Sequence, residues 1–235
     1  MARLDRFHFE RELWNQGHAS VAGVDEVGRG PLAGPVVVAA VILPHRWLMK
    51  GLPRKLRGLN DSKQLTEKQR QCFYDVLCDT EDVAYALAQL DAGEVDRLNI
   101  LRATHVAMNA ALVALQPSPQ HVLVDGLRVN SLNFPQTPLV AGDSRSFSIA
   151  AASVIAKVTR DRLMTEYDRI WPEYGFASHK GYSTPEHLHA LAEHGPCPIH
   201  RQTFAPVRLN QLDLFEPPSI TNASSAEPFL RQTPR

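Results

Sequence analysis

The stretch that decides the fold runs from Val21 to Leu43 and reads VAGVDEVGRGPLAGPVVVAAVIL. Two apolar runs flank a segment rich in glycine and proline, which predicts two neighbouring strands of a mostly buried sheet. The acidic pair Asp25 and Glu26 stands at the end of the first run. Ionised carboxylates are rarely buried alone, and side chains adjacent on a strand point to opposite faces. The pattern therefore favours a divalent cation at this strand end, and the alternative is a strand that ends in a polar turn.

Length and composition are those of a globular protein. The chain has 235 residues, of which 44% are hydrophobic and 21% charged, which is enough for one domain or a small pair. The longest uncharged apolar run, Val36–Leu43, is too short to span a bilayer, and the first residues do not resemble a signal peptide. Three cysteines without Cys-x-x-Cys spacing predict reduced thiols. We therefore expect a cytoplasmic protein with no membrane partner, and by default a monomer.

The net charge is zero, which argues against a simple electrostatic nucleic-acid binder. The charges are nevertheless segregated, because basic residues predominate over 54–70 and only acids occur among the charged residues of 75–96. A neutral chain can thus carry a basic face. From charge alone, two solvated surface patches are an equally good interpretation.

The rest of the sequence alternates predicted strands and helices, which indicates an α/β sheet with helices on its faces. Strands are expected over 83–90 and 121–126 with a further short one before 141, helices over 66–79, over 91–115 in broken form and over 146–171, and a loop over 45–65. Thr66 with Gln69, and Asp91 with Glu94, fit capping boxes. We expect one catalytic domain over 1–209, including a C-terminal helical part, and a flexible tail over 210–235.

Carboxylates recur where apolar runs meet glycine. Asp125 follows the strand expected at 121–126, and Asp143 stands just before a long helix, so both are expected near Asp25 and Glu26. Hard oxygen ligands select Mg²⁺ or Mn²⁺ over zinc, and two such ions can hold a phosphodiester and activate water. Five histidines between 179 and 200 are the competing feature, but their spacing matches no metal signature. We expect them to have structural or surface roles.

Three loop features could contact a nucleic acid. The glycines of Gly28-Arg29-Gly30 can expose backbone groups while the guanidinium takes a phosphate, or they can form a tight turn. Lys63 could contact a phosphate, although loop lysines are commonly just solvated. Tyr182 could stack on a sugar or base, although a tyrosine packed in the core is the commoner case.

Taken together, these segments resemble the bacterial ribonuclease HII family, the type 2 ribonucleases H. The resemblance covers about Val21 to Pro206 and rests on six matched stretches: AGVDEVGRGPLAGP from 22, LNDSKQL from 59, VLVDG from 122, GDS from 142, SIAAASVIAKVTRD from 148 and YGFASHKGY from 174. It implies a ribonuclease H-like fold, a mixed five-stranded sheet flanked by helices. It also implies an endonuclease that cleaves the RNA strand of RNA–DNA hybrids and incises 5′ of single ribonucleotides in duplex DNA.

The same resemblance implies roles for individual residues. Asp25, Glu26, Asp125 and Asp143 would hold two Mg²⁺ or Mn²⁺ ions, and cleavage would leave a 3′-hydroxyl and a 5′-phosphate. The Gly28-Arg29-Gly30 backbone would read the ribose 2′-OH. The remaining implied substrate contacts are Lys63, Arg145, Ser146, Lys180 and Tyr182, with Tyr182 on the sugar beyond the RNA-to-DNA junction.

Three rival functions stay open at this point. The sister enzyme ribonuclease HIII shares the fold, but Gly28-Arg29-Gly30, Tyr182 and the lack of an added N-terminal domain speak against it. A non-catalytic nucleic-acid-binding module would not gather acids where phosphates must lie. A metal-dependent phosphatase acting on small esters would not need the basic segment.

A short peptide near the C-terminus indicates a protein partner. Gln211, Leu212, Asp213, Leu214 and Phe215 form a Gln-Leu-x-Leu-Phe peptide, which resembles the one by which bacterial repair proteins dock on the sliding clamp. The alternative is that these apolar residues pack back on the domain.

Overall fold

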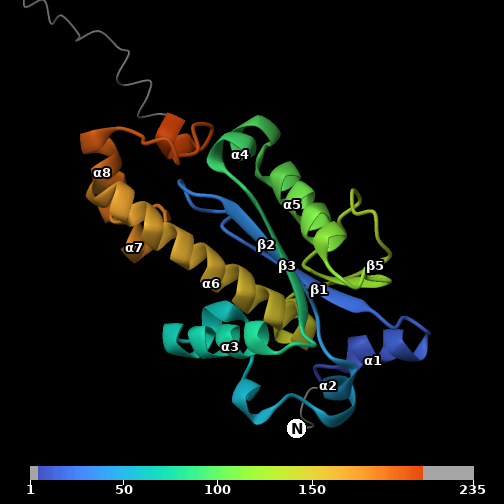
Figure 1. The fold of residues 1–235 in the computed structure, drawn as a ribbon. Coiled ribbons are helices and arrows are strands. Elements are labelled where there is room, and N and C mark those ends of the chain that lie inside the picture. Colours follow the sequence, from blue (N-terminus) through green and yellow to red (C-terminus); the bar gives the residue numbers. More distant parts are fainter. Residues whose placement is uncertain (1–4, 209–235) are drawn as a thin grey trace, which may run out of the picture.

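The computed structural model describes residues 5–208, which form a five-stranded sheet flanked by helices (Figure 1). The strands are β1 Val21–Val27, β2 Val36–Ile42, β3 Ala84–Leu90, β4 His121–Asp125 and β5 Gln136–Leu139. The helices are α1 His8–Asn15, α2 His45–Lys50, α3 Glu67–Asp79, α4 Ala92–Leu98, α5 Ile100–Ala114, α6 Phe147–Ile170, α7 Phe176–His179 and α8 Pro185–His194. Short 3-10 turns are η1 Arg54–Leu56, η2 Ser62–Gln64, η3 Gly142–Ser144 and η4 Pro172–Tyr174.

The order of the strands places the acidic strand ends side by side. The sheet has the order β3-β2-β1-β4-β5, in which β1 is antiparallel to β2 and parallel to β4. Val24 pairs with Val124, so Asp25 and Asp125 follow paired residues on adjacent parallel strands. Carboxyl ends of parallel strands meet at one edge of the sheet. The mixed five-stranded sheet confirms the predicted α/β class.

Helices cover both faces of the sheet, α6 with α3 on one face and α5 on the other (Figure 1). The first turns of α6 lie directly on β1 at Gly23, where a Cβ atom would stand 2.2 Å from the carbonyl carbon of Ser148. Only glycine permits this backbone-to-backbone contact. Because Asp143 immediately precedes α6, the contact also brings that residue toward the end of β1.

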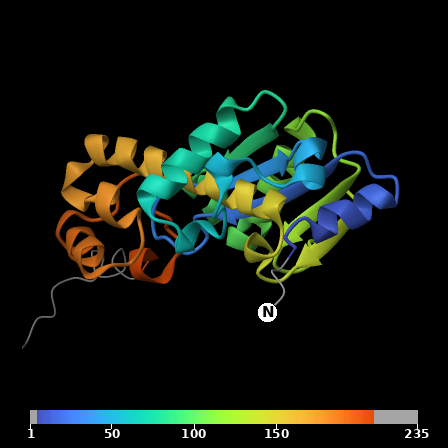
Figure 2. The ribbon, with the colours of Figure 1, turned by 90° about the horizontal axis from the view of Figure 1, so that it is seen from below.

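The predicted C-terminal helical part is present as α7, α8 and a helical turn at 205–208. It gathers around the C-terminal half of α6, at the opposite end of the molecule from α1 (Figures 1 and 2). A small apolar cluster that includes Ala33, Met164 and Phe176 joins it to the loop between β1 and β2. A bridge between Ala33 and His200 ties the same two regions together.

Both predicted capping boxes are confirmed, at the starts of α3 and α4. The loop predicted over 45–65 is partly wrong, because α2, η1 and η2 lie within it. Helix α2 has six residues and buries Trp47 and Leu48, too few positions to display a helical period in the sequence. Helix α1 lies outside the predicted elements for the same reason. Within residues 5–208, no helix has both the length and the apolarity to cross a membrane.

Candidate active site

Three of the four predicted carboxylates converge at one edge of the sheet. Asp25 ends the buried part of β1, Asp125 ends β4, and Asp143 lies in η3 ahead of α6. One carboxylate oxygen from each lies within 4.8 Å of the others. In the described part of the chain, this is the only group of three or more acidic, histidine or cysteine side chains that could hold a metal.

Backbone amides fix the orientation of two of these carboxylates. Asp25 Oδ1 accepts a hydrogen bond from the backbone N–H of Glu26 at 2.7 Å. Asp125 Oδ1 accepts one from the N–H of Gly142, also at 2.7 Å. A Cβ on Gly142 would stand 2.6 Å from the Ile149 side chain, so the glycine allows the Asp143 turn to approach β4. The aspartates are therefore held in place by the fold itself.

The aspartates repel one another when ionised. Burial raises the pKa of Asp25 well above its usual value, and the charges of Glu26 and Asp125 raise it further. Burial and the charges of Asp125 and Asp61 raise the pKa of Asp143 to about 6. Such a pocket of oxygen ligands with excess negative charge fits hard divalent cations, which neutralise it. The donor set thus agrees with the Mg²⁺ or Mn²⁺ chemistry expected from the sequence.

Glu26, the fourth predicted carboxylate, is partly engaged elsewhere. Its Oε1 accepts a hydrogen bond from the guanidinium of Arg29 at 2.9 Å, and it is not one of the three converging side chains. It still lies close enough for its charge to raise the pKa of Asp25. The role of Glu26 as a metal ligand stays a prediction.

Asp61 is a fifth acid that the sequence analysis did not single out. It caps η2 by accepting a hydrogen bond from the N–H of Lys63 at 2.9 Å, and its side chain also reaches Asp143. The Asn-Asp-Ser-Lys stretch drew attention to Lys63, whose own side chain is exposed at this turn. The Asn-Asp-Ser-Lys motif does contribute to the aspartate centre, but the residue that contacts the centre is Asp61 and not Lys63.

The N-terminal segment braces the Asp143 turn, a contact that no sequence motif predicts. The guanidinium of Arg6 donates to the carbonyl oxygens of Asp143 and Leu59. The buried carboxylate of Glu10, on α1, accepts from the hydroxyls of Ser146 and Ser148 at 2.6 and 2.7 Å. These contacts join residues 53 to 138 positions apart in the sequence, so no local pattern reports them.

The structure brings Gly28-Arg29-Gly30 and Tyr182 together. Arg29 and Gly30 are exposed, and a Cβ built on Gly30 would lie 3.7 Å from the Tyr182 ring. Tyr182 is 41% exposed and is therefore not a core residue. Gly28 has φ +90°, and a Cβ there would stand 2.2 Å from Nε of Arg160, so no other residue fits.

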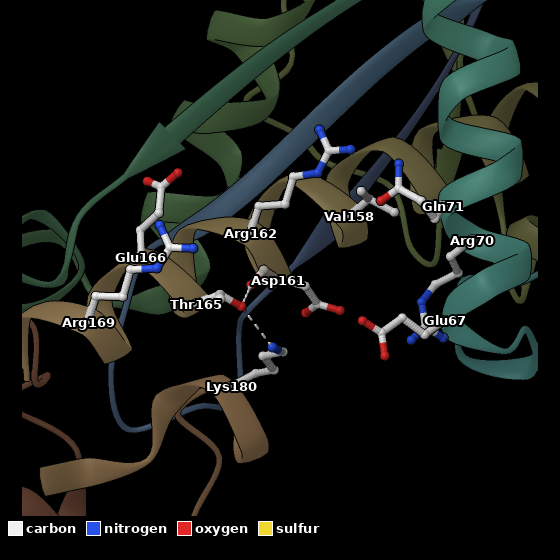
Figure 3. Close-up of a pocket in the computed structure, with 10 residues that line it drawn as sticks. All are labelled: Glu67, Arg70, Gln71, Val158, Asp161, Arg162, Thr165, Glu166, Arg169 and Lys180. Atoms are coloured by element: carbon white, nitrogen blue, oxygen red, sulfur yellow. Dashed lines mark hydrogen bonds between the residues drawn. The ribbon is translucent and has the colours of Figure 1, made fainter. Parts of the chain in front are cut away.

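The other predicted substrate contacts lie in different surroundings. Arg145 is exposed, and its guanidinium lies 5.2 Å from the Phe9 ring. Ser146 is fully buried, and its hydroxyl caps α6 and donates to Glu10. The Lys180 amine donates to the Thr165 hydroxyl at 3.2 Å (Figure 3). The Arg145 guanidinium makes one long hydrogen bond, 3.3 Å to the carbonyl oxygen of Val140.

Lys180 borders a hollow of about 240 Å³ between α3 and α6 (Figure 3). None of the predicted carboxylates lines this hollow. Its charged residues carry both signs: Glu67, Arg70, Asp161, Arg162, Glu166, Arg169 and Lys180. Arg70 donates to the carbonyl oxygens of Ser62 and Leu65 and so supports the turn that carries Asp61. The hollow is separate from the acidic centre.

Two of the five histidines between 179 and 200 are buried in the described structure, and His189 and His194 lie at the surface. His187 and His200 are buried, and their Nε2 atoms lie 3.0 Å apart. His187 Nδ1 contacts the carbonyl oxygen of Tyr182 at 2.8 Å, which supports the loop that presents the tyrosine.

Three aspartates that converge at a sheet edge, beside an exposed glycine-containing loop, are typical of a metal-dependent nuclease. Residues 22–207 match the family model for ribonuclease HII. The chain belongs to the ribonuclease HII family and is a metal-dependent endoribonuclease that acts on RNA–DNA hybrids. Ribonuclease HII of Geotalea daltonii is 50% identical over 216 residues, which cover 88% of this chain and 96% of that protein. The enzyme of Desulfitobacterium hafniense strain DSM 10664 / DCB-2 is 49% identical over 205 residues, 87% of this chain and 75% of that protein.

Solved structures share the fold. The crystal structure of ribonuclease H2 from Pyrococcus horikoshii OT3 has a TM-score of 0.69 and 29% identity, and the match covers 83% of this chain and 98% of that one. Bst-RNase HIII in complex with Mn²⁺ has a TM-score of 0.67 and 22% identity, over 83% and 70% of the two chains. RNase HII of Archaeoglobus fulgidus, solved as a complex with PCNA, has a TM-score of 0.65 and 22% identity, over 79% and 95%. These likenesses confirm the predicted ribonuclease H-like fold.

Proposed function

We propose that the enzyme incises duplex DNA on the 5′ side of single embedded ribonucleotides, as well as cleaving hybrids, and leaves a 3′-hydroxyl and a 5′-phosphate. The observation that carries the proposal is the position of the exposed Arg29–Gly30 backbone next to the aspartate centre. Arg29 forms an ion pair with Glu26, the neighbour of Asp25 on β1, so the loop begins directly after the acidic pair at the end of this strand. A group bound to that loop therefore lies close to the carboxylates.

Two divalent ions, Mg²⁺ or Mn²⁺, are the proposed cofactors. Asp25, Asp125 and Asp143 would hold them, with Glu26 as the fourth ligand once its side chain leaves Arg29. Ions bound there would supply an activated water and stabilise the leaving oxygen. The pKa values of Asp25 and Asp143, raised first by burial and then by the charges of neighbouring acids, support the assignment, because a bound cation stabilises the ionised carboxylates.

The chain itself would select and orient the substrate. The Gly28-Arg29-Gly30 backbone would hydrogen-bond the 2′-OH that distinguishes RNA from DNA. Tyr182, exposed beside Gly30, would stack on the sugar of the following deoxynucleotide. Lys63 and Arg145, both exposed, would contact phosphates, and Lys180 would do so after it leaves the Thr165 hydroxyl and the Ala177 carbonyl oxygen. Ser146 would act through its backbone, because its hydroxyl is buried.

The test uses a duplex DNA with one ribonucleotide, an otherwise identical all-DNA duplex, and a hybrid. With Mg²⁺ or Mn²⁺ we expect a single cut 5′ of the ribonucleotide, cuts in the RNA strand of the hybrid and none in DNA. End-labelling identifies the 3′-hydroxyl, and EDTA abolishes cleavage. Cleavage of the hybrid without the single-ribonucleotide duplex would contradict the proposal and indicate a preference for longer RNA tracts.

We propose further that residues 211–215 dock on the bacterial sliding clamp, with Gln211, Leu212, Leu214 and Phe215 as the contacts. These residues and the proposed tail 210–235 lie outside the described part of the chain. The complex of the Archaeoglobus fulgidus enzyme with PCNA offers a precedent for a protein partner on this fold. A short peptide that orders on binding should bind with about micromolar affinity. The catalytic domain over 1–209 is proposed to act as a cytoplasmic monomer.

Titration of the clamp with a labelled peptide covering 208–216 tests the docking. The matched control peptide carries Leu214→Ala and Phe215→Ala. Saturable binding of the first peptide alone is expected, and equal or absent binding of both peptides would contradict the docking.

A further inference from the structure

Two arginines are fully buried without a carboxylate partner. Arg160 lies in α6 and Arg201 follows α8, and both have zero exposed area. Burial lowers the pKa of Arg160 to about 10 and that of Arg201 to about 9. Among the ion pairs of residues 5–208, neither guanidinium takes part. Buried charge must be compensated by hydrogen bonds, so the partners of these two groups need to be identified.

The guanidinium of Arg201 is saturated by one loop. A guanidinium carries five N–H donors in a planar fork, and Arg201 makes five hydrogen bonds, all to carbonyl oxygens of the loop between β1 and β2. The acceptors are Gly28 (2.5 Å), Arg29 (3.0 Å), Pro31 (2.8 Å) and, twice, Gly34 (2.9 and 3.1 Å). The Phe204 ring centroid lies 5.0 Å from the guanidinium carbon and helps to hold it.

These hydrogen bonds set the orientation of two peptide planes. In a planar trans peptide the C=O and the following N–H point in opposite directions. Since the carbonyls of Gly28 and Arg29 face Arg201, the N–H groups of Arg29 and Gly30 point away from it. Within the described chain, neither N–H has a hydrogen-bond acceptor. Farther along the loop, the Leu32 N–H donates to Gly181 at 2.8 Å, so the loop amides that face inward are used.

We propose that Arg201 is a positioning residue that turns the Arg29 and Gly30 amides outward as a ready-made pair of donors for a ribose 2′-OH. This inference rests on the proposed function, which assigns 2′-OH reading to the Gly28-Arg29-Gly30 backbone. Both residues are exposed, so a ligand can reach the donors. Donors fixed before binding do not lose conformational freedom when the ligand arrives, which increases affinity. A lysine at 201 would keep the charge but could not replace the planar fork.

Arg160 offers a matched control. It is equally buried and also donates only to backbone carbonyls, those of Ala33, Pro35 and Lys180, at 2.9 to 3.0 Å. The Arg160 side chain packs against Gly28, but none of its acceptors belongs to Gly28 or Arg29, so it does not set the orientation of those two peptide planes. A buried arginine with a purely structural role should therefore behave like Arg160.

The experiment compares full-length wild-type protein with Arg201→Lys and Arg160→Lys. Affinity is measured for a duplex with one ribonucleotide and for the identical all-DNA duplex, with Ca²⁺ in place of Mg²⁺ and absence of cleavage verified. The readout is the ratio of the two affinities, which a general loss of stability does not change. We expect Arg201→Lys to reduce the ratio about tenfold, as loss of one good hydrogen bond would. We expect Arg160→Lys to leave it within about twofold at a similar loss of Tm.

An unchanged affinity ratio in Arg201→Lys, or an equal reduction of that ratio in Arg160→Lys, would overturn the positioning role of Arg201. Neither result would contradict the proposed function. If the wild-type protein binds both duplexes equally well, recognition of the 2′-OH by this loop would be contradicted as well. The cleavage assay described above tests the activity separately.

If Arg201→Lys does not fold, a measurement on the wild-type protein still tests whether the Arg29 and Gly30 amides are the donors. The backbone amide resonances of Arg29 and Gly30 are followed by NMR during titration with each duplex. We expect both amides to shift and to become protected from exchange with the ribonucleotide duplex only. Equal responses to both duplexes, or no response, would overturn the inference.

Discussion

The aspartate centre and the arginine-held loop handle buried charge in opposite ways. At the centre, Asp25, Asp125 and Asp143 converge on one another, and burial, together with the charges of neighbouring acids, raises the pKa values of Asp25 and Asp143. In the loop, Arg201 makes every hydrogen bond that its guanidinium can make. The first region is complete only with a ligand, whereas the second is complete in the chain alone. The contrast separates residues that bind from residues that hold the binding groups in position.

The largest expected effect comes from removing one charge from the aspartate centre. Asp125→Asn should lower kcat by 10²–10³ or more, on the order of the loss of a key electrostatic group, because an amide is not an anionic ligand. Its Tm without metal should be unchanged or higher, because one repulsive charge is gone. Gel-based cleavage and thermal melts measure both quantities. Asp75→Asn, at an exposed site on α3, is the control, and near-normal turnover of Asp125→Asn would refute the metal assignment.

Removing a buried arginine should have the opposite effect on stability. Arg160→Met leaves the carbonyls of Ala33, Pro35 and Lys180 without a donor, at about 1–3 kcal/mol for each buried acceptor. Since ~1 kcal/mol corresponds to about 2–4 °C in a chain of this size, Tm should fall by roughly 10 °C. Arg169→Met, exposed on the same helix, is the control and should melt like the wild type. Equal Tm values for all three proteins would show that the buried guanidinium does not stabilise the fold.

A substitution of Tyr182 tests whether the surroundings of the loop held by Arg201 include a side chain that contacts the substrate. Tyr182→Ala should weaken binding of the single-ribonucleotide duplex by about 1–3 kcal/mol, the usual contribution of one stacking aromatic. Its Tm should change little, because the side chain is 41% exposed. Tyr85→Ala, 38% exposed on β3, is a control of similar burial. A loss of several degrees in Tm with unchanged affinity would instead assign Tyr182 a structural role.

The smallest expected effect is a pH dependence of the metal-free protein. The folded-state pKa of Asp143 is raised from 3.8 to about 6, so its contribution to stability is present below pH 3.8 and is lost as pH rises through 6. Asp143→Asn should therefore gain Tm relative to the wild type between pH 4 and pH 7 in EDTA. Solvent screening at this partly exposed carboxyl reduces the gain to about 2–4 °C, or ~1 kcal/mol.

The buried pair His187 and His200 also affects the Tm of each protein in that experiment, but it does not affect the difference in Tm between the wild type and Asp143→Asn. Burial lowers the pKa of His200 to about 4, so the stability that depends on its neutral form is lost as pH falls below about 6.5. Both proteins contain His200, and only the difference between them reports on Asp143. A constant difference in Tm from pH 4 to pH 7 would contradict the raised pKa of Asp143.

The sequence predicted features that depend on neighbouring residues. The capping boxes at Thr66 and Asp91 are confirmed, because a cap and its partner are three positions apart. Asp25 and Asp125 could be placed at one sheet edge because each directly follows an apolar run. Short helices such as α1 and α2 were missed, since one or two turns show no periodicity.

Contacts between distant segments were beyond such reasoning. In the sequence, Arg160 and Arg201 look like ordinary surface cations, and only the folded chain shows that they are buried against backbone carbonyls. The pairing of Glu26 with Arg29 is local, but whether Glu26 binds a metal or its neighbour depends on the surrounding charge. Asp61 reaches Asp143 across more than eighty positions, so the motif alone did not identify it as part of the centre.

The hydrogen bond from Arg201 to the carbonyl oxygen of Gly28 joins residues 173 positions apart and has a consequence for protein synthesis. A ribosome completes β1, β4 and the start of α6, with all the converging aspartates, well before residue 201 leaves the exit tunnel. A chain stalled in that interval holds the carboxylates but not the guanidinium that turns the loop amides outward. Translation order therefore supplies the converging aspartates first and the arginine that holds the loop last.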